Sequence, residues 1–154
     1  MYVPGAARLY STPYPYRYNP QEAEVIALIL ESIQGERDDE LFYDFLIGKA
    51  PTLQEKEIIT GIRDDERKHR QMFRKLYTAL TGANAPAGSE SKEALPAGYL
   101  EGIEKALLGE LKAFEKYRKI YLNIRPEYRD WIFEIMTDEI KHAGYYNWLY
   151  AKNK

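Results

Sequence analysis

The sequence predicts an all-α protein, a four-helix bundle made of two helix hairpins with a long crossover connection. Three observations lead to this fold class. Apolar residues recur at three- and four-residue steps in four long segments, which is the period of an amphipathic helix. The chain contains an internal repeat, and a stretch rich in small residues and turn formers separates the two copies. A chain of 154 residues is long enough for one domain with a proper core.

The N-terminal residues 1–20 differ in composition from the bundle expected at 21–154, because prolines alternate with tyrosines there. This composition disfavours helix, so we predict an extended arm. Two interpretations of the arm stay open. It is either a poorly ordered terminus or a segment whose tyrosines pack on a neighbouring subunit, since aromatic residues are enriched at interfaces.

The first hairpin is expected to consist of two antiparallel helices with a short connection. The first helix should run from Gln21 to about Gly48, and its apolar stripe carries Glu36, a carboxylate that is costly to bury without a partner. The second helix should begin after a capping box formed by Thr52 and Glu55 and run to about Leu80. Basic residues on one stripe of this helix predict a solvated face: Arg63, Arg67, Arg70 and Arg74.

The linker at about 81–96 is longer than a simple up-and-down bundle requires, since such bundles use only about two to eight residues between helices. When extended, about 16 residues reach about 50 Å, which exceeds the roughly 40 Å length of a helix of about 27 residues. We therefore expect the linker to cross from one end of the bundle to the other.

The second hairpin should begin with a helix from about Ala97 to Ile124. Pro126 then opens the fourth helix at a position that tolerates proline, and the fourth helix reaches nearly to the C-terminus.

Composition excludes several classes of protein. The formal charge of -2 gives no footprint for nucleic acid or an anionic membrane, and no apolar run approaches the roughly 20 residues that span a bilayer. The N-terminus lacks the apolar core of a signal peptide, so we expect a cytoplasmic location. The absence of cysteine excludes disulfides, zinc–thiolate sites and iron–sulfur clusters, so any metal must bind to oxygen and nitrogen.

The pentapeptide Asp-Glu-x-x-His occurs twice, at 65–69 and 138–142, and contains both histidines of the chain. On a helix, residues i and i+3 share a face, so each copy aims a carboxylate and an imidazole at one point. A single copy would most often be a surface pair. The neighbours recur as well, with a shift of 73, which identifies a duplication: Ile59, Ile62, Asp65, Glu66, His69 and Phe73 correspond to Ile132, Ile135, Asp138, Glu139, His142 and Tyr146.

The other two helices repeat with a shift of 74 and make Glu110 the counterpart of Glu36. A Glu from each of two helices and a Glu-x-x-His from each of the other two form the ligand set for two metal ions in a four-helix bundle. The sequence supplies this set completely: Glu36, Glu66, His69, Glu110, Glu139 and His142.

With these residues the chain resembles the ferritin-like superfamily of di-iron carboxylate proteins, most closely the rubrerythrin-like branch. The Gly-Glu pair followed seven residues later by Tyr is a recurring feature of that branch, and here it occurs as Gly35-Glu36 with Tyr43 and Gly109-Glu110 with Tyr117. The resemblance covers roughly residues 21–150. We expect no rubredoxin-type centre within this sequence, because it contains no cysteine.

The resemblance implies two iron ions, or alternatively two manganese ions or a mixed pair. Glu36 and Glu110 would be terminal ligands, Glu66 and Glu139 would bridge the metals, and each histidine would supply one nitrogen. Supporting groups would be Asp65 and Asp138, each holding the histidine of the opposite repeat, and Tyr43 and Tyr117, each bonded to a ligand carboxylate. Rubrerythrin carries a further glutamate at the position of Ala113, and the possible replacements here are Asp39 and Glu40.

The resemblance also implies a function, an oxidoreductase of the di-iron oxidase or peroxidase type that reacts with oxygen or hydrogen peroxide. Such an enzyme would need an external electron donor and would form a homo-oligomer, with a dimer favoured. Two alternatives remain: a non-enzymatic iron-handling or structural assembly protein of ferritin-like fold, and an enzyme similar to manganese catalase.

Overall fold

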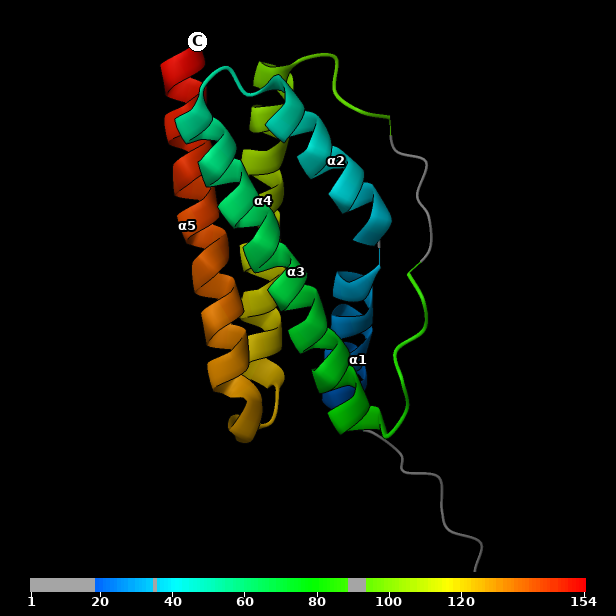
Figure 1. Ribbon diagram of the computed structural model, residues 1–154. Helices are drawn as coiled ribbons and strands as arrows, with labels where there is room; N and C mark the ends of the chain where they lie inside the picture. Colours follow the sequence, from blue (N-terminus) through cyan, green and yellow to red (C-terminus); the bar gives the residue numbers. More distant parts are fainter. Residues whose placement is uncertain (1–18, 35, 89–93) are drawn as a thin grey trace, which may run out of the picture.

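The structure, a computed structural model, describes residues 19–34, 36–88 and 94–154, with the side chains of 36–38 set aside. Within these ranges the chain forms five α-helices, one 3₁₀ turn and no strand. The predicted all-α bundle of two hairpins is therefore confirmed (Figure 1). The arm predicted at 1–20 lies outside the described residues, apart from its last two positions.

The first arm of the first hairpin is two helices, α1 (Pro20–Ile33) and α2 (Glu36–Lys49), and the prediction of one continuous helix was wrong. Gln34 ends α1 in an extended conformation with ψ of 152°. The sequence gives the reason, because the residues at 36–40 are all charged and two of them are aspartates, which are poor helix formers. This turn therefore has no apolar side chain to hold it to the core, and α2 is tilted relative to α1 (Figure 1).

The second arm, α3 (Leu53–Thr81), begins at Thr52, whose hydroxyl accepts from the Glu55 N–H at 3.3 Å, and ends at Gly82 with φ of 73°, in the left-handed region. The other half of the predicted capping box is absent. The buried Glu55 carboxylate instead accepts from the Tyr99 hydroxyl at 2.8 Å and from Asn153 at 3.2 Å, and it lies 3.0 Å from Lys152.

The second hairpin consists of α4 (Tyr99–Asn123), the 3₁₀ turn η1 (Pro126–Tyr128) and α5 (Arg129–Asn153). Helix α3 ends at one end of the bundle and α4 begins at the other, so the connection crosses the length of the bundle, as its length predicted (Figure 1). In the part of the chain that the structure describes, no helix is both long enough and apolar enough to cross a membrane.

The core consists of two apolar clusters with a polar layer between them. One cluster includes Ile29, Phe73 and Ile135, and the other includes Leu46, Ile62 and Tyr146. The Asp-Glu-x-x-His segment of α3 lies between Ile62 and Phe73 in the chain, and that of α5 lies between Ile135 and Tyr146. Both segments are therefore held at the middle of the bundle by apolar packing on either side.

Candidate metal centre

Carboxylate and imidazole groups from α3, α4 and α5 converge in the polar layer. Glu66, Glu110, Glu139 and His142 each offer one ligand atom, and these four atoms all lie within 4.8 Å of one another. His69 adjoins the group, with Nδ1 3.2 Å from Glu139 Oε1. All five side chains are buried or nearly so, because the helix period turns positions i and i+3 of each motif toward the same interior point.

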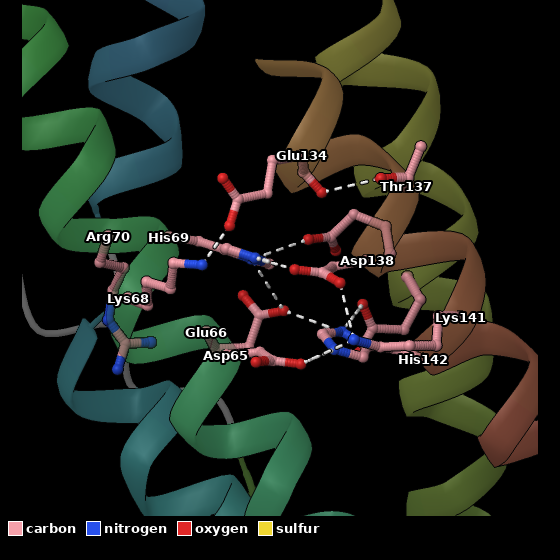
Figure 2. Close-up of polar contacts among 12 residues, drawn as sticks. Asp65, Glu66, Lys68, His69, Arg70, Glu134, Thr137, Asp138, Lys141 and His142 are labelled. Carbon is pink, nitrogen blue, oxygen red and sulfur yellow. Dashed lines mark hydrogen bonds and ion pairs between the residues drawn. The ribbon is translucent and has the colours of Figure 1, made fainter. Parts of the chain in front are cut away.

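Each imidazole ring lies between the interior carboxylates and an outer aspartate of the opposite repeat. Nε2 of His69 is 3.0 Å from Asp138 Oδ2, and Nε2 of His142 is 3.0 Å from Asp65 Oδ2 (Figure 2). The rings lie 6.1 Å apart between centroids, with 26° between their planes. Both Nδ1 atoms are consequently on the side of the interior carboxylates.

The electrostatics of the layer show how the protein compensates its carboxylates with protons. Burial lowers the pKa of His69, but attraction by Glu139 and Glu66 outweighs burial and raises that pKa to about 10. Burial also lowers the pKa of His142, which Glu110 and Glu66 raise to about 11. Burial and the charge of Glu66 raise the pKa of Glu139 well above its ordinary value. Protons held on the two imidazoles thus offset part of the negative charge that the carboxylates bring into the layer.

The donor atoms fit a metal pair. Glu66 Oε1, His69 Nδ1, Glu139 Oε1 and His142 Nδ1 are buried and make no hydrogen bond to any described residue. The separations of 3.2 to 3.6 Å among them suit ion pairs, but the groups are not aligned as donor and acceptor. Buried polar groups are normally satisfied, so four unsatisfied atoms that face one point indicate a missing common partner. Oxygen with imidazole nitrogen suits iron or manganese.

The structure does not place every residue of the predicted set. Glu36 is the first residue of α2, and its side chain lies outside the described part of the chain. Glu40 points to α3, where it binds Arg67 at 2.6 and 2.8 Å and Arg70 at 2.7 Å. Arg70 is thereby buried, so its assignment to a solvated face was wrong.

A cavity of about 270 Å³ lies against the ligand carboxylates, between α2 and α4. Glu66, Glu110 and Glu139 border the cavity, and Asp39 and Ala113 also line it. Tyr43 and Tyr117 are buried in its wall, where burial and the nearby carboxylates raise the pKa of both hydroxyls well above the ordinary value. Among the described residues, no hydrogen bond joins either tyrosine to a ligand carboxylate.

Two residues near the centre were not predicted from the sequence as part of it. The Tyr146 hydroxyl is fully buried and has no hydrogen-bond partner in the described part of the chain. Burial raises the pKa of this hydroxyl well above its ordinary value, and the nearby charges of Glu110 and Glu66 raise it further. Lys141 contacts both outer aspartates. The position of Tyr146 could have been predicted, because this residue follows His142 by four positions and so lies on the same helix face.

One comparison with known proteins, the comparison with family models, found a match. Residues 28–99 match the family model Rubrerythrin, a range that includes α2 and α3 and therefore Glu36, Glu66 and His69. No curated protein and no solved structure matched the chain. The family match spans just under half of the chain and is consistent with the resemblance to the rubrerythrin-like branch that the motifs predicted.

Proposed function

We propose that the protein is an oxidoreductase with a dimetal centre, a pair of iron ions, that reacts with hydrogen peroxide or oxygen. The observation that carries this proposal is the convergence of Glu66, Glu110, Glu139 and His142 within 4.8 Å in a buried layer. The rubrerythrin match over 28–99 supports the same class of centre.

In this proposal each half of the chain supplies one terminal carboxylate, one bridging carboxylate and one imidazole. Glu36 and Glu110 would each hold mainly one metal, and Glu66 and Glu139 would be shared between the two. His69 and His142 bind through Nδ1, the ring atom that is buried without a hydrogen bond, while Nε2 faces an aspartate. An imidazole held by a carboxylate in this way is oriented for a metal.

When bound, the iron pair would supply the electrons that cleave the oxygen–oxygen bond. The chain's own residues supply the site: the four carboxylates balance the positive charge of the metals, and the apolar clusters on both sides exclude bulk water. The cavity between α2 and α4 gives a small molecule access to the carboxylates. Reduction of hydrogen peroxide consumes two electrons and two protons and yields two water molecules, so an external donor must supply the electrons.

The first experiment is elemental analysis with an absorption spectrum of protein purified without added metal, from cells supplied with both iron and manganese. We expect about two iron ions per chain. Iron-loaded protein should consume peroxide in the presence of a reductant, and Glu66→Ala should lose that activity, because Glu66 Oε1 lies within 3.6 Å of the Nδ1 atoms of both imidazoles. Glu104→Ala, an exposed position on α4, is the matched control.

Other outcomes would replace the proposal. Equal peroxide consumption by wild type and Glu66→Ala would exclude catalysis at this centre. Two manganese ions with disproportionation of peroxide in the absence of a reductant would indicate a catalase. Iron oxidation that yields a mineral inside a cage-sized particle would indicate iron handling, whereas the proposed enzyme is expected to be a dimer.

A further inference from the structure

Lys141 lies on the outer side of the centre, where its ammonium group contacts both outer aspartates. Its Nζ donates to Asp138 Oδ1 at 2.6 Å and to Asp65 Oδ2 at 3.0 Å. Each aspartate also contacts the Nε2 of one histidine at 3.0 Å. One ammonium group therefore closes a continuous chain of polar contacts from His69 to His142 (Figure 2).

The other half of the duplication does not use its lysine in this way. Lys68 is the counterpart of Lys141, with the shift of 73, and it binds Glu134 of α5. The counterpart of Glu134 is Gly61, which offers no carboxylate. Lys141 therefore has no acid at the equivalent position of α3, and it turns to the two aspartates instead. Gly61, Asp65 and Lys141 line one surface hollow together with His142.

We propose that Lys141 is a positioning residue for the metal centre, which holds Asp65 and Asp138 so that each fixes its imidazole with Nδ1 toward the metals. This inference rests on the proposed function. The physical reason is that two neighbouring carboxylates repel one another unless a cation lies between them. Without Lys141 they would turn toward water, and the histidines would lose the contacts that orient their rings.

The direct test compares the binding of Fe²⁺ and Co²⁺ by Lys141→Gln and wild type, by anaerobic competition with a chromophoric chelator. We expect about ten-fold weaker binding, the lower end of the range for partners of metal ligands, and a changed Co²⁺ absorption spectrum. Lys68→Gln removes the same charge from the equivalent position and should bind as wild type does. Lys141→Arg keeps a cation and should recover most of the affinity.

Gly61→Glu tests the same idea without altering Lys141. A Cβ at this position meets no atom within 4 Å, and Glu favours helix over Gly, so the variant is expected to fold. The new carboxylate occupies the position equivalent to Glu134 and should draw Lys141 away from the aspartates, with metal binding weakened several-fold. Binding equal to wild type in both Lys141→Gln and Gly61→Glu would overturn the inference.

A metal-free measurement separates this inference from the proposed function. In the apo protein, the Nε2 protons of His69 and His142 should be protected from exchange and visible by ¹⁵N NMR in wild type and Lys68→Gln. They should broaden or disappear in Lys141→Gln. Wild-type protein that binds no metal but shows this difference would overturn the dimetal function and leave the positioning role intact. Nε2 signals unchanged by Lys141→Gln would overturn the positioning role.

Discussion

The two halves of the duplication present the same Gly-Glu pair in different helical settings. Gly109 and Glu110 lie inside α4, an uninterrupted helix of 25 residues. In the first half α1 ends at Ile33 and α2 begins at Glu36. Because Gly109 is helical without a break, a glycine at this position is not enough to end the helix. Whether the helix continues must therefore depend on the residues that follow the Gly-Glu pair. These are leucine, lysine, alanine and phenylalanine in α4, but four charged residues at 37–40 in the first half.

The residues that face one another across each hairpin also differ, and again the first half has charged residues where the second half has apolar ones. Glu40 of α2 binds Arg67 and Arg70 of α3, whereas the equivalent residues of the second half are Phe114, Ile140 and Ala143. Charge pairs thus add to the apolar contacts between α2 and α3, while apolar residues stand at the equivalent positions of α4 and α5. The duplication repeats the metal-binding pattern without repeating the packing that supports it, so we expect the second half to be the more rigid one.

Metal removal should have the largest effect and should expose the difference between the halves. A ligand at about a thousand times its Kd stabilises by about 4 kcal/mol, so chelation should lower the Tm by about 10 °C. Hydrogen exchange should then rise most in α2, because loss of the metals removes the ligand bond proposed for Glu36, the first residue of that helix. A Tm that is unchanged after verified metal removal would contradict an internal site.

Breaking the charge pairs of the first half should have the next largest effect. Glu40→Ala leaves the buried Arg70 without its closest carboxylate and should lower the Tm by about 5 °C. The difference from wild type should shrink in 1 M salt, because screening weakens the pairs in wild type. Glu104→Ala on α4 is the control. Equal hydrogen exchange of α2 in both variants would show that Glu40 does not hold this helix.

Alkaline pH should destabilise the metal-free protein, through His69 of the first half before His142 of the second. Both pKa values are higher in the folded protein, at about 10 and about 11, than the ordinary value of 6.5. The folded state therefore holds more protons above pH 6.5, and stability declines from there until the pH passes the folded values. We expect the Tm to fall steadily between pH 7 and 10. Thermal unfolding of chelated protein at each pH would measure this, and metal-loaded protein should show a smaller decline.

The smallest expected effect concerns Tyr146, whose counterpart in the first half is Phe73. Removal of the unpartnered hydroxyl by Tyr146→Phe should raise the free energy of unfolding of the metal-free protein by about 1 kcal/mol. Phe73→Tyr should lower it by a similar amount. A decrease in Tyr146→Phe, or a changed spectrum of the metal-loaded variant, would mean that the hydroxyl gains a partner when metal is bound.

Much of the fold could be predicted because its signals are local. Thr52 and Gly82 mark the ends of α3, and the linker length predicted the crossover. The repeat of Asp-Glu-x-x-His brought the two histidines to one place, since helix periodicity fixes which face a residue occupies.

The remaining features depend on neighbours that periodicity does not specify. We attribute the end of α1 at Ile33 to the charged sequence at 36–40, which contains no apolar residue and interrupts the apolar helix period of the stretch. Arg70 is buried because Glu40 lies opposite it on another helix. The Glu55 carboxylate leaves its own helix end because Tyr99 and Asn153 approach it from elsewhere. To predict such features, one must know which residue of a neighbouring helix packs against the position in question.

The buried Glu55 makes the last turn of α5 part of the bundle's interior. Among the described residues its carboxylate contacts Lys152, Asn153 and, at the start of α4, Tyr99. Trimming the chain after Ala151 would leave a carboxylate enclosed with a single phenol donor, a costly burial. An affinity tag therefore belongs beyond Lys154, and exopeptidase digestion of a few residues should be enough to loosen the end of the molecule where α3, α4 and α5 meet.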